Sequence, residues 1–151
     1  MNILIIAAHP DDEVLGMGGT IAKHTSQHDT VSIIYMATGI TGRRELSESE
    51  YEIKNIPKKI QEDWQQEIGK LRQDANKSAR LLKVKNVKFF DFPDNEMDGI
   101  HLLKVVKVIE KEIKSAKPDR IYTNHYGDLN VDHKVVYNAT LVACRPANFP
   151  V

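Results

Sequence analysis

The chain has 151 residues, 41 % of them hydrophobic, which suits a single folded domain with a packed core. Lys plus Arg and Asp plus Glu both number 21, so the formal net charge is zero and no overall field favours nucleic acid or an anionic membrane. The single cysteine, Cys144, excludes an intramolecular disulfide and a Cys-rich zinc module. We expect it to be buried and inert, in a reducing compartment such as the cytoplasm.

Apolar periodicity predicts four strands, each followed by a helix. The predicted strands are 3–8, 30–37, 87–92 and 120–123, and the predicted helices are 13–28, 60–82, 102–117 and a last one that starts near His133 and stops near Pro146. Strands that alternate with helices imply right-handed crossovers and a mostly parallel sheet between two helix layers, so the fold class is α/β. Residues 46–57 show no apolar period and are interpreted as a connection. The first strand is too short to span a bilayer.

Polar clusters follow every predicted strand, at residues 9–13, 38–44, 91–98 and 125–133. In open parallel sheets ligands bind outside the carboxyl ends of the strands, so we expect these four segments to meet in space. We expect three other histidines to be ordinary surface residues: His24, His28 and His101. On the last helix, Val135, Ala139 and Val142 are expected to lie on one side.

The first cluster has the composition of half a metal site. His9 and Asp12 are three residues apart, so a turn that enters a helix brings both to one side. His133 is the best third ligand, because it lies beyond the end of the fourth predicted strand with Asp132 beside it. Two histidines and one carboxylate leave coordination positions open for water and substrate. Asp11 is then left to act as the general base on activated water.

Simpler structural interpretations stand beside these hypotheses. The acidic run 11–13 could serve simply as a helix cap with no role in metal binding, and His133 could be a surface histidine. Asp94 and Asn95 are first of all turn formers, and Arg43 is first of all a solvated loop charge. The glycines at 16–19 lack the G-x-G-x-x-G order, and the sequence contains neither a P-loop nor a G-x-S-x-G elbow.

Four separated segments together resemble the LmbE-like, or PIG-L, family of metal-dependent N-acetylglucosamine deacetylases. The segments are AHPDDEVLGMGG at 8–19, DFPDNEMD at 91–98, KPD at 117–119 and HYGDLNVDH at 125–133. The resemblance implies a Rossmann-like fold over one domain, residues 1–151. It also implies a zinc ion held by three ligands, His9, Asp12 and His133, with Asp11 as general base. By the same similarity Arg43 is a substrate-binding candidate, and Asp94 and Asn95 are kept as substrate-binding candidates beside their role in the turn.

The second motif departs from the His-Pro-Asp-His of many members, whose first histidine stabilises the oxyanion. His125 and Asn130 are both kept as catalytic candidates for that role, since each can donate a hydrogen bond. Asp132 is expected to orient a histidine ligand from behind. Members usually continue past residue 146 with further strands, so a C-terminally truncated domain is an open alternative.

The sequence therefore predicts a zinc-dependent hydrolase that removes acetyl from an N-acetylated amino sugar and releases acetate and a free amine. Fe²⁺ is the alternative metal, because the ligand set alone does not choose between them. The alternatives from other classes are a truncated relative that binds sugar or metal without turnover, and a non-haem iron oxygenase. The expected partner is a small amino sugar, with no nucleic acid and no membrane span, and homo-oligomerisation is left open.

Overall fold

A computed structural model describes residues 1–40 and 58–146 of the chain. In chain order the elements are β1 (Asn2–Ala7), α1 (Asp12–Ser26), β2 (Thr30–Ala37), α3 (Lys58–Leu81), β3 (Asn86–Phe92), the 3-10 turn η2 (Met97–Gly99), α4 (Leu102–Ala116), β4 (Arg120–Thr123) and α5 (Val131–Ala143). The predicted α/β class is confirmed, and Arg43 lies outside the described residues, as does the predicted connection 46–57. No helix of the described part is both long and apolar enough to cross a bilayer.

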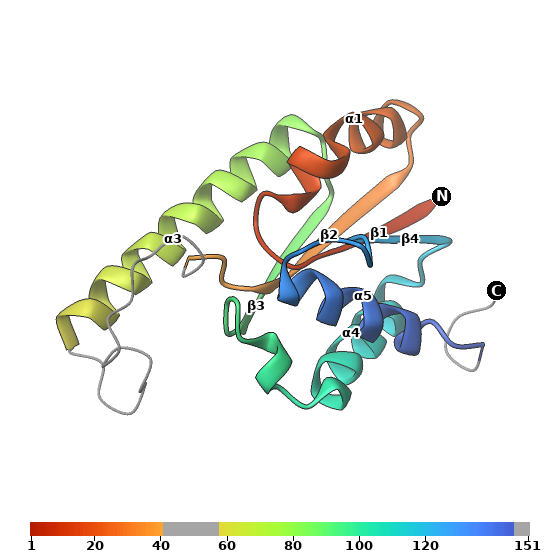
Figure 1. The fold of residues 1–151 in the computed structure, drawn as a ribbon. Coiled ribbons are helices and arrows are strands. Elements are labelled where there is room, and N and C mark those ends of the chain that lie inside the picture. Colours follow the sequence, from red (N-terminus) through yellow and green to blue (C-terminus); the bar gives the residue numbers. More distant parts are fainter. Residues whose placement is uncertain (41–57, 147–151) are drawn as a thin grey trace.

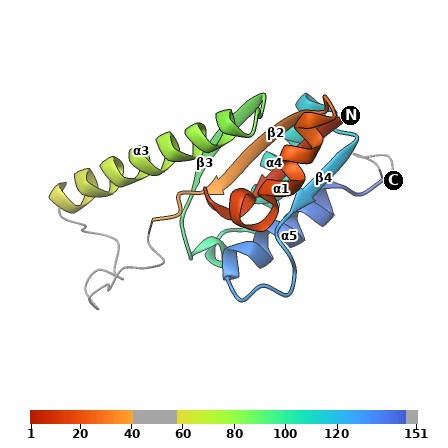
Figure 2. The same cartoon turned by 90° about the horizontal axis from the view of Figure 1, so that it is seen from above.

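The sheet has the strand order β3-β2-β1-β4, and every described pairing is parallel. Alternate side chains of β1 point to opposite faces, as the pleat of a strand requires. Leu4 and Ile6 pack with α4 and α5 on one face, while Ile3 and Ile5 pack with α1 and α3 on the other. Figure 1 shows these two helix layers on either side of the sheet, and Figure 2 looks onto the α1 and α3 layer.

The chain reverses its direction of winding between β1 and β4. From β1 it runs through β2 to β3 at one edge of the sheet, and then α4 carries it back so that β4 pairs with β1. The connections after these two neighbouring strands therefore leave toward opposite faces, and a crevice forms where their carboxyl ends lie side by side. Residues 8–13 and 124–133 enter this crevice.

Gly39 allows the segment after β2 to lie close to the end of β1. Its φ is +77°, and a Cβ at this position would be 3.1 Å from Pro10 Cδ and 3.2 Å from Leu71 Cδ2. Any other residue would have a strained backbone at this φ and a Cβ too close to Pro10 and Leu71, so the position requires glycine. This close approach forms one wall of the crevice.

Several expectations about helix faces are wrong. His24 is 7 % exposed and not a surface residue, because its Nδ1 lies 2.7 Å from Asp29 Oδ2 and its Nε2 lies 3.0 Å from Tyr122 Oη. On α5 the buried apolar residues are Val136, Ala139 and Ala143, whereas Val142 is 38 % exposed. Cys144, expected to be buried, is only partly buried, and this partial burial raises the pKa of its thiol.

Candidate metal centre

Three side chains from the two sides of the crevice direct ligand atoms toward one point. His133 Nε2 lies 3.3 Å from His9 Nδ1 and 3.2 Å from Asp12 Oδ1, and His9 Nδ1 lies 3.7 Å from the other oxygen of Asp12. Ligands about 2.1 Å from a tetrahedral metal ion are about 3.4 Å from one another. The donor set His, His and carboxylate at these separations therefore fits a divalent metal ion.

The carboxylate of Asp12 is held by one oxygen, so that the other faces His133. Its Oδ2 accepts hydrogen bonds from the His9 backbone N–H at 2.9 Å and from Asn124 Nδ2 at 3.0 Å. Asn124 is itself fixed, because its Oδ1 accepts from the Ala8 backbone N–H at 2.9 Å. Asn124 thus joins the end of β1 to the loop after β4 and orients Asp12 at the same time.

The imidazole of His9 is oriented from behind by two buried carboxylates. Its Nε2 lies 3.0 Å from Asp132 Oδ2 and 2.9 Å from Asp94 Oδ1, and these side chains are 0 % and 3 % exposed. Asp132 also accepts from the backbone N–H groups of Asn95 and Met97. A carboxylate that holds the far nitrogen of a histidine fixes the ring and leaves Nδ1 to face the ligand cluster.

His133 owes its position to the first turn of α5. Asn130 caps this helix, since its Oδ1 accepts from the backbone N–H of Asp132 at 2.8 Å and of His133 at 3.4 Å. The Nδ1 of His133 lies 3.0 Å from Asp128 Oδ2. One short segment, residues 128–133, therefore does two things. Its cap and Asp128 position His133, and its Asp132 orients the ring of His9.

Electrostatics keep the cluster charged when no metal ion is bound. Burial on its own would lower the pKa of His9, but its hydrogen bonds to Asp132 and Asp94, with the charge of Asp12, raise the pKa to about 10. Burial also opposes the charge on Asp12, yet hydrogen bonds from His133, His9 and Asn124 leave its pKa below the ordinary value. The pKa of His133 is raised by Asp12 and Asp128 against its own burial.

Asp11 stands beside the cluster with an unusual backbone. Its φ of 150° and ψ of −25° are rare for a residue with a Cβ, and strain of this kind is commonest where a side chain must be aimed at a site. Asp11 lines a cavity of about 450 Å³ together with the three ligand residues. Asp94, Asn95 and Asn130 line the same cavity.

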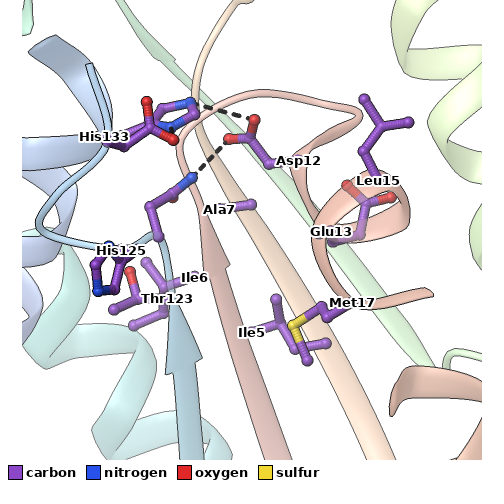
Figure 3. A pocket seen from close by; sticks show the side chains of 13 residues that line it. Ile5, Ile6, Ala7, Asp12, Glu13, Leu15, Met17, Thr123, His125 and His133 are labelled. Carbon is purple, nitrogen blue, oxygen red and sulfur yellow. Dashed lines mark hydrogen bonds and ion pairs between the residues drawn. The ribbon is translucent and has the colours of Figure 1, made fainter. Parts of the chain in front are cut away.

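A second cavity of about 490 Å³ lies between α1 and β4 (Figure 3). Asp12 and His133 lie at its upper end, and His125 lies lower on the wall that follows β4. His125 is exposed, and its Nδ1 accepts from the Gly127 backbone N–H at 3.1 Å. Of the two oxyanion candidates, Asn130 therefore lines the first cavity and His125 the second.

Sequence reasoning missed two residues at the centre, Asn124 and Asp128. Both lie in the polar segment after β4. Their place just beyond the carboxyl end of a parallel strand is the feature of the sequence that could have marked them as site residues. Asp94, a substrate-binding candidate that lines the Asp11 cavity, also contacts His9. Asn95 contributes its backbone N–H to Asp132, and its Oδ1 accepts from Asn130 Nδ2 at 3.3 Å. The side-chain partners of such residues depend on loop geometry that spacing does not predict.

Comparison with known proteins identifies the family. Residues 4–144 match PIG-L, described as GlcNAc-PI de-N-acetylase. The chain belongs to the PIG-L family. It is 27 % identical to the uncharacterized deacetylase YaiS of Escherichia coli (strain K12) over 149 residues, which cover 95 % of this chain and 68 % of YaiS. It is 30 % identical over 113 residues to the diacetylchitobiose deacetylase of Thermococcus kodakarensis, covering 74 % of this chain and 37 % of that protein.

Solved structures show the same fold. The N,N'-diacetylchitobiose deacetylase from Pyrococcus horikoshii, complexed with its inhibitor MPG, aligns with a TM-score of 0.73 and 25 % identity over 97 % of this chain and 52 % of that one. A deacetylase of the teicoplanin biosynthetic pathway aligns with a TM-score of 0.76 at 19 % identity, over the whole of this chain and 62 % of that one, and supports the fold alone. The PIG-L chain described here thus spans about half to two thirds of most of these relatives.

Proposed function

We propose that this PIG-L chain hydrolyses the acetamide of an N-acetylated amino sugar of the N-acetylglucosamine type and releases acetate and a free amine. The observation that carries the proposal is the convergence of His9 Nδ1, Asp12 Oδ1 and His133 Nε2 beside Asp11 in one cavity. Two relatives are named as diacetylchitobiose deacetylases, which act on N-acetyl groups of a sugar, and this agrees with the proposal.

The metal ligands and the general base have separate roles in the proposed reaction. His9, Asp12 and His133 would hold Zn²⁺, with Fe²⁺ as the alternative, and such an ion would supply Lewis-acid polarisation of the amide carbonyl and activation of water. Asp11 accepts the proton of the attacking water and delivers it to the departing amine nitrogen. The new C–O bond forms first, and the C–N bond breaks once the nitrogen has received its proton, so the products are a carboxylic acid and an amine.

Other residues of the site position the reacting groups. Asp132 and Asp94 keep the His9 ring in place through Nε2, and Asn124 keeps Asp12 in place through Oδ2. Asn130 lines the Asp11 cavity, and the side-chain N–H that does not donate to Asn95 Oδ1 can donate to the oxyanion. We propose Asn130 and His125 as alternatives for this role and Asn95 as a contact for the sugar hydroxyl groups. Arg43 stays a substrate-binding candidate by family similarity.

The test of this function is acetate release by the zinc-loaded chain from N-acetylglucosamine and N,N'-diacetylchitobiose. Asp11→Asn keeps the shape of the side chain and removes the base, so kcat should fall by about 10²–10⁴-fold while one metal ion per chain remains bound. Asp63→Asn on the exposed side of α3 is the matched control and should behave as wild type. Full deacetylation by Asp11→Asn would contradict the mechanism. Metal binding by a wild-type chain that releases no acetate would favour a non-catalytic binding module.

A further inference from the structure

The candidate metal centre lies between two cavities, one of which has a more apolar lining than the other. Both cavities are lined by Asp12, Leu15 and His133. Beyond this shared wall, the Asp11 cavity has the carboxylates and amides already described, together with the apolar side chains of Ile40 and Leu71. The other cavity, which we call the α1/β4 chamber, has an apolar floor and side formed by Ile5, Ala7 and Met17 (Figure 3). Its exposed lining is mostly apolar, although polar side chains also line it, namely Glu13, Thr123, Asn124, His125 and Asp128.

An amide substrate placed at the shared wall would reach into both cavities. The acyl chain and the substituted nitrogen leave the carbonyl carbon in different directions, so only one of them can point into each cavity. A sugar needs hydrogen-bonding partners, which the Asp11 cavity offers, whereas the α1/β4 chamber offers mainly hydrocarbon contact. The acyl side of the substrate therefore belongs in the chamber.

The chamber is much larger than an acetyl group requires. A methyl group is similar in size to a water molecule, whose share of liquid volume is about 30 Å³, against a chamber of about 490 Å³. An acetyl group would leave most of the apolar wall in contact with water. A longer alkyl chain would cover that wall, and each added methylene that becomes buried strengthens binding by about fourfold.

We infer that the α1/β4 chamber is an acyl-chain site, and that the preferred substrates are amino sugars with a medium-length N-acyl chain instead of N-acetyl. The inference rests on the proposed amide hydrolysis and extends its substrate class. The overall reaction is unchanged: water adds to the acyl carbon, the C–N bond breaks, and a medium-chain carboxylate and a free amine are released.

The test is a series of N-acetyl-, N-butanoyl-, N-hexanoyl- and N-octanoylglucosamine given to the zinc-loaded chain, with glucosamine release as readout. We expect kcat/KM for the hexanoyl compound to exceed that for the acetyl compound by at least about tenfold. Cleavage of the acetyl compound with an equal or falling kcat/KM along the series would overturn the acyl-chain site and leave the deacetylase function standing.

A matched pair of variants on α1 tests the chamber itself. Gly16 lines the chamber and Gly19 does not, and a Cβ at either position meets no atom within 4 Å, so both positions have room for a side chain. Gly16→Phe should bring the hexanoyl-to-acetyl ratio of kcat/KM back to about one, and Gly19→Phe should keep the wild-type ratio. Identical ratios in the two variants would contradict the assignment.

Binding provides a readout that does not depend on turnover. In the Asp11→Asn background, the affinity for the same four compounds, measured by calorimetry, should rise with chain length, and Gly16→Phe should remove that rise. This result would support the acyl-chain site even if no compound in the series were hydrolysed, which is the outcome that would defeat the proposed function. An affinity independent of chain length would defeat the acyl-chain site alone.

Discussion

At the scale of single residues, the two oxygens of the Asp12 carboxylate have different tasks. Oδ2 is occupied by the His9 backbone N–H and by Asn124, whereas Oδ1 faces His133. A carboxylate with one oxygen already hydrogen-bonded can offer only the other as a ligand, so Asn124 determines how Asp12 binds a metal ion.

Replacing Asn124 with aspartate tests this division of tasks. Asn124→Asp retains an oxygen that can accept from the Ala8 backbone N–H but loses the N–H that donates to Asp12. We expect the affinity for Zn²⁺ to fall by about 10–100-fold, measured by competition with a chromophoric chelator. Asn138→Asp, an exposed position of α5, makes the same change of charge and should leave the affinity unchanged. An unchanged affinity in Asn124→Asp would show that Asp12 needs no such support.

The protonated His9 gives the metal-free protein a distinct pH dependence. Its pKa is about 10 in the folded chain against 6.5 ordinarily, because Asp132 and Asp94 hydrogen-bond to it. A raised folded-state pKa contributes stability that is fully present below pH 6.5 and is lost as pH rises through about 10. In chelator, the free energy of unfolding of wild type relative to His9→Gln should decrease by about 1.4 kcal/mol per pH unit within this window. A difference that stays constant from pH 6 to 10 would contradict the assigned charge.

At the scale of elements, the helix ends and strand ends follow from local sequence. The predicted strands at 30–37 and 120–123 match β2 and β4, because branched and aromatic runs there are bounded by polar residues. The helix expected to stop before Pro118 ends at Ala116, and Lys117 follows in the left-handed conformation with φ 44° and ψ 58°. The ends of β2, β4 and α4 are therefore determined by the residues that lie next to each end in the sequence.

The left-handed cap after α4 can be improved. Lys117→Gly removes the contact between Cβ and backbone that this conformation imposes, while the Lys117 backbone N–H still donates to the Ile113 carbonyl. We expect the free energy of unfolding to rise by about 0.5–1 kcal/mol in urea titrations. Lys114→Gly, inside the same helix, should lower it by about 1 kcal/mol. A loss of stability in Lys117→Gly would mean that the cap is not under strain.

Helix faces were predicted less well than helix bounds. On α5, the sequence pattern predicted Val135 on the apolar side, whereas the packing against α4, η2 and β1 buries Val136. His24 is buried because Asp29, in the turn that follows its helix, and Tyr122, on the distant strand β4, satisfy its two ring nitrogens. A single sequence does not reveal which polar residue has found such partners.

At the scale of the whole molecule, the position of the candidate site follows from topology. The strand order β3-β2-β1-β4 places the ends of β1 and β4 side by side, and His9, Asp12 and His133 come from the segments that follow them. The sequence predicted this convergence, because parallel strands end at the same edge of the sheet. It did not predict the hydrogen bonds of Asn124, Asp128 and Asp94, which depend on the paths of the loops.

The central claim is that three side chains from these two strand ends bind one divalent metal ion. Its most direct test is the metal content of purified chains after zinc loading and dialysis, measured by elemental mass spectrometry. Wild type and His101→Ala, a variant of an exposed histidine, should each retain one ion per chain. His133→Ala should retain almost none, since two donors hold zinc too weakly to survive dialysis. One ion per chain in His133→Ala would contradict the account.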